Sequence, residues 1–245
     1  MKIILFISTL LFSFNIFAGN SKITSFGNAK GKLPNIYGNK AKTFYCNCDY
    51  QKKSIKLQGC GLQLKKFKKR SKRLEWEHIV PAHAFGKSFK EWRDSKSICG
   101  AKKSKSGKIK KISGRKCASK RNKLFRYMEA DIYNLVPAIG SINAIRSNYS
   151  MAEINRSQKL CSTDLKISKR KVTPPSFRKG DVARIYMYMD QEYPGRGIIS
   201  KKNQGLFKKW NLEDPISAEE CVIYLKKKAF QGNINKVLES HCLLK

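Results

Sequence analysis

The stretch Arg73-Leu74-Glu75-Trp76-Glu77-His78-Ile79-Val80-Pro81 decides how this chain folds. Leucine, tryptophan, histidine and valine at its even-numbered positions alternate with charged residues and an isoleucine at its odd-numbered positions. This period of two predicts a β-strand that ends at Pro81. Adjacent strand residues point to opposite faces, so Glu77 and His78 can serve one site only where the strand ends or bulges.

Basic residues concentrate on both sides of this strand. Residues 52–73 hold ten Lys or Arg, and residues 99–117 hold eight. The whole chain has 52 Lys and Arg against 17 Asp and Glu, a formal net charge of +35. Such a charge predicts a partner or substrate that is a dense polyanion. Since no base-reading motif is present, we expect contacts to the nucleic-acid backbone that do not depend on sequence.

Length and composition favour one compact domain. The chain has 245 residues, of which 41% are hydrophobic and 11% aromatic, enough to build a core. Disordered, collagen-like and coiled-coil proteins are excluded by the same composition.

The N-terminus has the features of an export signal. Residues 1–18 carry Lys2 directly after Met1, continue as an apolar run and end on the small Ala18. This pattern predicts a secretory signal peptide, which leaves 19–245 as the mature domain. No later segment reaches transmembrane length, so we expect a periplasmic or secreted protein without stable membrane insertion.

The eight cysteines are expected to form up to four disulfides in an oxidising compartment, with the connectivity open. One residue separates Cys46 from Cys48, so these two would reach different partners. A zinc site at this Cys-x-Cys is the weaker alternative, because no second Cys or His pair lies at ligand spacing. Cys99 and Cys117 are the first candidates for a local pair, which would close the basic segment between them.

The rest of the chain predicts a mixture of irregular segments and helices. We expect an irregular segment over 19–43 and a loop over 99–117. Apolar residues from Leu124 to Leu135 recur at helical spacing, with Ser119 as the cap. The chain then breaks through Asn134–Gly140, and Ser141 would cap a short helix with Asn143 in its first turn.

Two further helices are expected in the C-terminal half. Residues 182–189 have helical periodicity, and Ser217-Ala218-Glu219-Glu220 predicts a capping box for a helix that ends near Gly232. The fold class is therefore a single α+β domain that is stapled by disulfides.

Few residues can carry acid–base or metal chemistry. The histidines are His78, His83 and His241, and the pair Glu77-His78 stands out. An acid beside a histidine is weak evidence alone, because a structural, hydrogen-bonded histidine would look the same. A zinc protease is excluded, since His78 and His83 are five positions apart with Pro81 between them.

Three blocks together resemble a known family. They are Glu75-Trp76-Glu77-His78-Ile79-Val80-Pro81-Ala82, Phe125-Arg126-Tyr127-Met128-Glu129-Ala130-Asp131 and Asn134-Leu135-Val136-Pro137-Ala138-Ile139-Gly140. The chain resembles, over roughly 45–242, the bacterial endonuclease I family of periplasmic and secreted sugar-nonspecific nucleases. Arg146-Ser147-Asn148 and Gln231-Gly232-Asn233 add to the likeness. The resemblance implies a ββα-metal (His-Me finger) site in a mixed domain that cleaves DNA and RNA with Mg²⁺.

The resemblance also implies roles for individual positions. His78 is similar to the family's general base, Glu77 and Asn143 to its two protein ligands of the metal, and Arg115 to its phosphate-binding arginine. The products would carry 5′ phosphates. With an unperturbed imidazole pKa of ~6.5, activity would rise through neutral pH as His78 loses its proton.

Supporting roles and alternatives complete the expectations. Glu129 and Asn134 match family positions and are assigned to supporting the site, whereas Glu75 and Trp76 are interpreted as structural. The exchange of Mg²⁺ for Mn²⁺ or Ca²⁺ stays open, and we expect a monomer. The alternative function is a secreted cationic protein that binds nucleic acid or an envelope without catalysis.

Overall fold

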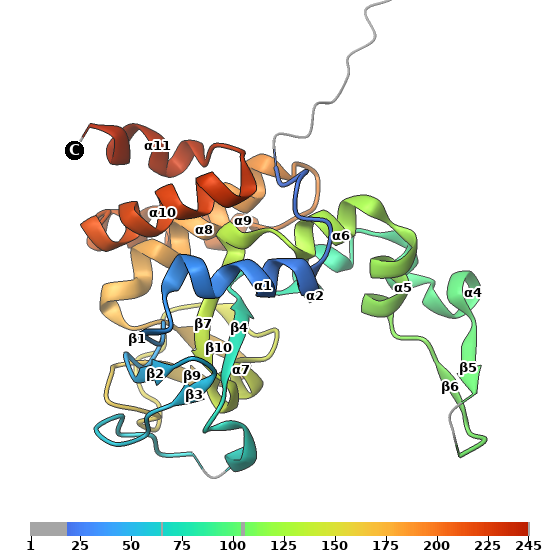
Figure 1. Ribbon diagram of the computed structural model, residues 1–245, viewed down its shortest axis with the longest axis horizontal. Coiled ribbons are helices and arrows are strands. Elements are labelled where there is room, and N and C mark those ends of the chain that lie inside the picture. The colour runs from blue at the N-terminus through green and yellow to red at the C-terminus, as the bar shows by residue number, and fades with distance from the viewer. Residues whose placement is uncertain (1–18, 65, 104–105, 245) are drawn as a thin grey trace, which may run out of the picture.

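The centre of the fold is the expected strand, paired with a second strand from later in the chain. In the computed structural model, β4 (Leu74–His78) runs antiparallel to β7 (Leu135–Ile139), with His78 opposite Leu135. Figure 1 shows the β4–β7 strand pair in the middle of the molecule, with helices on both sides. The structure describes residues 19–64, 66–103 and 106–244. The expected signal peptide, residues 1–18, lies outside them and stays a prediction.

Helices α1, α6 and α7 surround the β4–β7 pair. Helix α1 (Phe26–Tyr37) packs Ala29, Leu33 and Ile36 into one hydrophobic cluster with Leu135. Helix α6 (Lys123–Glu129) and the 3-10 turn η2 (Ile132–Asn134) lead into β7, and α7 (Gly140–Arg146) follows it directly. Because α7 follows β7 directly, its side chains lie next to β4.

The C-terminal part is helical, as expected. It consists of α8 (Lys179–Glu192), α9 (Lys201–Glu213), α10 (Ala218–Gln231) and α11 (Lys236–Leu243). Ser217 caps α10 by accepting from the Glu220 amide, and Gly232 ends it with a φ of 90°. The predicted helix over 182–189 and the predicted cap at Ser217 are therefore confirmed, whereas the Glu220 carboxylate accepts from Arg184 rather than completing a capping box.

Short elements complete the chain. The other helices and turns are η1 (Lys68–Arg70), α2 (Ala82–Gly86), α3 (Lys90–Arg93), α4 (Ser95–Cys99), α5 (Gly114–Arg121) and η3 (Ser176–Arg178). The other strands are β1 (Lys40–Lys42), β2 (Asp49–Gln51), β3 (Ser54–Ile55), β5 (Ala101–Lys103), β6 (Ile109–Lys111), β8 (Ser150–Met151), β9 (Lys166–Ser168) and β10 (Lys171–Thr173). They form the sheets β1-β2-β3, β8-β10-β9 and β5-β6.

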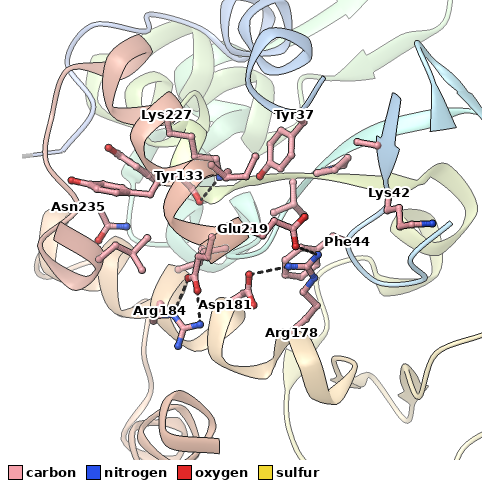
Figure 2. Close-up of a pocket in the computed structure, with 18 residues that line it drawn as sticks. Tyr37, Lys42, Phe44, Tyr133, Arg178, Asp181, Arg184, Glu219, Lys227 and Asn235 are labelled. Carbon is pink, nitrogen blue, oxygen red and sulfur yellow. Dashed lines mark hydrogen bonds and ion pairs between the residues drawn. The ribbon is translucent and has the colours of Figure 1, made fainter. Parts of the chain in front are cut away.

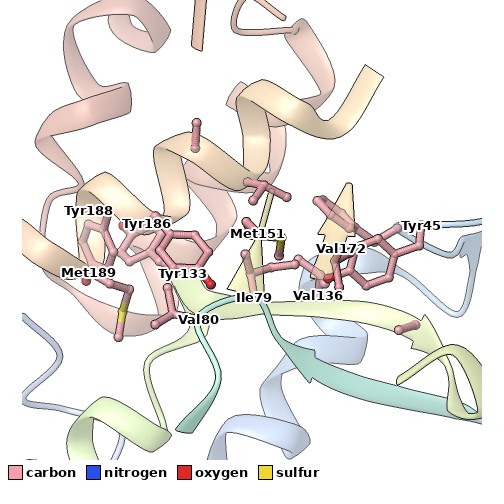
Figure 3. Close-up of a cluster of buried hydrophobic side chains, with 14 of the residues drawn as sticks. Tyr45, Ile79, Val80, Tyr133, Val136, Met151, Val172, Tyr186, Tyr188 and Met189 are labelled. Carbon is pink, nitrogen blue, oxygen red and sulfur yellow. The ribbon is translucent and has the colours of Figure 1, made fainter. Parts of the chain in front are cut away.

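The main core lies where the chain leaves β4. Ile79 and Val80 are fully buried, and Figure 3 shows them among aromatic and aliphatic side chains from β7, β10 and α8. The Asn134 side chain accepts from the Val80 amide (2.7 Å) and donates to the Val80 carbonyl (2.9 Å). Strand β4 ends at His78, and this amide clamp satisfies the backbone that would otherwise be buried unpaired.

All eight cysteines are paired. The disulfides are Cys46–Cys161, Cys48–Cys60, Cys99–Cys117 and Cys221–Cys242. The expected local pair is confirmed, and so are the different partners of Cys46 and Cys48. With every cysteine used in a disulfide, the zinc alternative for Cys-x-Cys is wrong.

Two expectations about segments without regular structure are wrong. Residues 19–43 contain α1, because its buried side chains recur at helical spacing despite Pro34 inside the helix. Residues 99–117 form β5, β6 and the start of α5 rather than a loop. Among the described residues, no helix has the length and apolar character to span a bilayer.

The helix expected from Leu124 to Leu135 is shorter and begins elsewhere. Asn122, not Ser119, caps α6, and the helix ends at Glu129. The Asp131 carboxylate accepts from the Tyr133 amide and starts η2, so Leu135 belongs to β7. Ser141 lies inside α7 and bonds to the Ser71 hydroxyl instead of capping the helix.

Candidate active site

The predicted site residues line one groove. The groove has a volume of about 1180 Å³, and its walls come from β4, α1, α5 and α7. Glu77, His78, Arg115 and Asn143 all line it. The fold thus brings together residues from three separate segments of the sequence. Basic side chains line the same groove, namely Lys30, Lys52, Lys53, Arg70, Arg73, Arg115 and Arg146.

His78 is fixed at the end of β4 as a neutral imidazole. Its Nε2 lies 2.8 Å from the backbone carbonyl oxygen of Glu129, and the Phe26 ring lies 4.7 Å from its ring, centroid to centroid. A carbonyl only accepts, so Nε2 carries the proton and Nδ1 is left as the acceptor. Burial and the positive charge of Arg115 lower the pKa of His78 to about 3. The expectation of activity rising through neutral pH rests on an unperturbed imidazole, whereas the surroundings of this ring shift its pKa downward.

The Glu77 carboxylate is buried beside a buried arginine but is not fully satisfied by it. Its Oε1 lies 3.2 Å from Nε of Arg146. Neither atom has a partner in hydrogen-bonding geometry among the described residues. Burial raises the pKa of Glu77 to about 7, although Arg146 acts in the opposite direction. A buried carboxylate oxygen without a good donor fits a cation better than it fits a purely structural role.

Asn143 is held by a residue that was interpreted as structural. Its Nδ2 donates to Oε2 of Glu75 (3.1 Å), which leaves the carboxamide oxygen to act as a ligand. The Glu75 carboxylate in turn pairs with the guanidinium groups of Arg70 and Arg73. Glu75 therefore fixes the orientation of Asn143, and its contacts go beyond a structural role in β4.

Gly140 makes this arrangement possible. A Cβ atom at position 140 would lie 2.7 Å from the Arg70 carbonyl oxygen and 2.7 Å from Oε1 of Glu75. The first residue of α7 must therefore lack a side chain for the Glu75 carboxylate to reach Asn143. This close packing joins the start of α7 to β4.

Glu129 links the arginine of the groove to the histidine. Its carboxylate accepts from Nε of Arg115 (2.5 Å), while its backbone carbonyl holds His78. The Arg115 side chain is 45% exposed, so its remaining N–H groups can reach a ligand in the groove. Asn134, the other residue expected to support the site, acts through the Val80 backbone just beyond His78.

The residues present fit a hydrated divalent ion. No group of three or more His, Cys, Asp or Glu side chains within the described ranges could hold a metal. Glu77 and Asn143 would supply two protein oxygens, and water would fill the other positions. Mg²⁺ prefers oxygen ligands and keeps several waters, so this sparse donor set suits it.

The sequence reasoning missed three residues around the site. Arg146 is 1% exposed, contacts Glu77 and donates to the Ile79 carbonyl, whereas the family resemblance implied no role for it. Phe26 covers the His78 ring from α1, a helix that was not expected. Glu75 was seen but interpreted as structural. Only for Glu75 was a signal present, as an acid two positions before Glu77 on the same strand face.

A second, smaller cavity contains none of the predicted site residues. It has a volume of about 90 Å³ and lies between β7, α8 and α10 (Figure 2). Its charged groups are paired with one another: Arg178 bonds to Asp181, and Arg184 to Glu220. Lys227 donates to the backbone carbonyl of Leu135 at 3.2 Å. These contacts tie the C-terminal helices to β7.

Comparisons with known proteins identify the family to which this chain is similar. The family model described as Endonuclease I matches residues 13–241. An extracellular deoxyribonuclease of Aeromonas hydrophila is 34% identical over 226 residues, covering 89% of this chain and 90% of the relative. Endonuclease-1 of Buchnera aphidicola subsp. Acyrthosiphon pisum (strain APS) is 34% identical over 230 residues, covering 91% and 84%. A periplasmic deoxyribonuclease of Aeromonas hydrophila is 30% identical over 226 residues, covering 89% and 86%.

The fold, the groove and these matches define the class of protein, a secreted or periplasmic nuclease with a mixed helix and strand domain. The chain belongs to the endonuclease I family.

Proposed function

We propose that this chain is a Mg²⁺-dependent endonuclease that hydrolyses phosphodiester bonds of DNA and RNA and leaves 5′ phosphates. The observation that carries the proposal is the neutral His78 ring beside the incompletely satisfied Glu77 carboxylate, in one basic groove. Relatives that are named deoxyribonucleases support DNA as a substrate.

His78 acts as the general base. With Nε2 bonded to the Glu129 carbonyl, Nδ1 takes a proton from the attacking water. The oxygen of that water attacks phosphorus, the bond from phosphorus to the 3′ oxygen breaks, and a proton from solvent completes the 3′ hydroxyl. The Glu129 carbonyl stabilises the imidazolium that His78 becomes when it has taken this proton.

The remaining side chains stabilise the charge that develops on the phosphate. Arg115 donates to non-bridging oxygens, for which its planar guanidinium is suited. Glu77 and Asn143 hold Mg²⁺. When bound there, the ion supplies positive charge for the pentacovalent state and the departing oxygen. Arg146, whose guanidinium lies against the Glu77 carboxylate, sets the position of that carboxylate.

Affinity for nucleic acid comes from the basic side chains that line the groove. Lysines and arginines along the groove contact phosphates. Salt weakens this binding, and on duplex DNA each phosphate contact contributes about −0.9 to the slope of log affinity against log salt concentration. We propose a monomer, to be checked by light scattering after gel filtration.

Incubation with plasmid, in Mg²⁺ and in EDTA, tests the proposal. The expected result is degradation in Mg²⁺ and intact but retarded plasmid in EDTA. Retardation without cleavage in both buffers would favour the alternative function, a cationic binding protein. Mn²⁺ and Ca²⁺ in place of Mg²⁺ would show which ions the sparse donor set accepts.

A further inference from the structure

The hairpin formed by β5 and β6 contributes nothing to the core. We call these six residues, Ala101–Lys103 and Ile109–Lys111, the basic ribbon. All six are exposed, and Ile109 is 78% exposed. Neither hydrophobic cluster of the described residues includes any of them. Figure 1 shows the ribbon projecting from α4 and α5 away from the rest of the molecule.

The ribbon also carries an unfavourable arrangement of charge. The register places Lys102 directly opposite Lys110, whereas Lys111 lies opposite Ala101 and Lys103 opposite Ile109. Like charges at paired positions destabilise a sheet, and an isolated two-stranded hairpin is marginal in water. An element that buries nothing and repels itself does not serve the stability of the domain. A polyanion would remove the repulsion.

The base of the ribbon is fixed beside the candidate active site. The Cys99–Cys117 disulfide joins the two ends, with the Cα atoms 5.8 Å apart. A Cβ atom at Gly114 would lie 2.5 Å from the Trp92 carbonyl oxygen, so the start of α5 packs tightly against α3. Arg115 follows at once and lines the groove. The ribbon therefore leaves the body at a set place next to the phosphate-binding arginine.

Its two faces indicate where it binds. Paired residues of an antiparallel ladder share a face, and neighbours along a strand alternate. Lys102 and Lys110 therefore lie on one face, and Lys103 and Lys111 on the other. A ribbon that lay flat on one phosphate strand would use a single charged face. Cations on both faces fit a position between two rows of phosphates, as in a groove of a duplex.

We propose that the basic ribbon enters the major groove of B-form duplex DNA beyond the scissile bond. This inference rests on the proposed nuclease function and adds a preference for one form of substrate. The B-DNA major groove is about 12 Å wide and admits a two-stranded ribbon. The major groove of A-form RNA is too narrow and deep for this, and a single strand has no groove. The ribbon thus increases affinity for duplex DNA alone.

The test compares two variants of equal charge. The ribbon variant replaces Lys102, Lys103, Lys110 and Lys111 with Gln. The control variant replaces four exposed lysines of α9 and α10 with Gln, namely Lys201, Lys202, Lys208 and Lys226. Fluorescence anisotropy in EDTA gives the affinity for labelled duplex DNA, duplex RNA and single-stranded DNA over a range of salt concentrations. Thermal unfolding verifies that both variants keep the wild-type fold.

The ribbon variant should lose roughly tenfold or more in affinity for duplex DNA relative to the control, and its salt slope should fall by about 0.9 for each lost contact. On duplex RNA and single-stranded DNA the two variants should behave alike. Equal affinities of both variants for duplex DNA would overturn the inference, and so would equal losses on all three ligands. Loss of binding to anionic lipid vesicles, with duplex affinity retained, would also overturn it.

The outcome is independent of catalysis. Because EDTA prevents metal-dependent cleavage, ribbon binding is measured whether or not the protein is a nuclease. Cleavage of a short single-stranded oligonucleotide in Mg²⁺ tests the proposed function separately.

Discussion

The groove and the basic ribbon use charge in opposite ways. In the groove, Glu77 and Arg146 are almost completely buried, and Glu75, Glu129 and Arg115 are each held by a neighbour. In the ribbon, all four lysines are exposed, and two of them, Lys102 and Lys110, lie opposite each other. Buried and fixed charges act on the groups that they contact, whereas exposed lysines on a projecting hairpin are free to bind phosphates of the substrate. Changes in the groove should therefore alter the rate, and changes in the ribbon should alter affinity.

Replacement of His78 by Ala should have the largest effect. Removal of a positioned general base should lower the cleavage rate by about 10²- to 10⁴-fold, with duplex affinity in EDTA unchanged. His83→Ala is the matched control, because His83 lines the same groove without contacting Glu129. Single-turnover kinetics measure the rate. Parallel losses of rate and affinity would mean that His78 is structural. They would also contradict the expectation that changes in the groove alter the rate alone.

Glu75→Ala should lower the affinity of the site for Mg²⁺. Without Glu75, the Asn143 side chain can rotate, and the Mg²⁺ concentration for half-maximal cleavage should rise by about 10- to 100-fold. Glu75→Gln keeps an acceptor for Nδ2 of Asn143 and should recover most of the metal affinity. Asp49→Asn, an exposed carboxylate paired with Lys42, is the control. A Glu75→Ala variant with unchanged Mg²⁺ dependence would leave Glu75 a structural residue.

Gly140→Ala should destabilise the fold near the site. The new methyl group would collide with the Arg70 carbonyl and the Glu75 carboxylate, at a cost of about 1–3 kcal/mol in the free energy of unfolding. Gly205→Ala on α9 meets no atom within 4 Å and should stabilise the helix by roughly 0.5–1 kcal/mol. Urea unfolding measures both variants. Equal stabilities would show that α7 does not need close contact with β4.

The smallest effect concerns pH. A general base acts when it is deprotonated, and burial together with Arg115 lowers the pKa of His78 to about 3. At saturating Mg²⁺, the loss of activity from protonation of His78 should therefore occur far below the ordinary pKa of ~6.5. Arg115→Gln removes a positive neighbour and should shift that loss to higher pH. A wild-type rate profile with its acid limb at the ordinary value would contradict the buried, neutral ring.

Local sequence patterns predicted part of this fold. The alternation in Leu74–His78, the helix cap at Ser217 and the short spacing of Cys99 and Cys117 were sufficient, because each depends on neighbouring residues. Helix α1 was missed because its Gly and Pro residues disfavour a helix, while buried contacts of Ala29, Leu33 and Ile36 stabilise it. The ribbon was missed because lysine-rich, Ser- and Gly-punctuated sequence is typical of loops.

The site was predicted less completely than the fold. The resemblance singled out His78, Glu77, Asn143 and Arg115, and the structure brings all four to one groove. The bond from Asn143 to Glu75 spans 68 positions, and the contact of His78 with the Glu129 carbonyl spans 51. A backbone carbonyl leaves no mark in a sequence. Contacts of this kind depend on tertiary packing and could not be inferred from local patterns.

The central claim is that Glu77 and Asn143 hold one divalent ion beside His78. Titration with Mn²⁺, followed by electron paramagnetic resonance, counts the bound ions directly and needs no cleavage. The account predicts one site in the wild-type protein and in the ribbon variant, and loss of that site in Asn143→Ala. Undiminished Mn²⁺ binding by Asn143→Ala would contradict it.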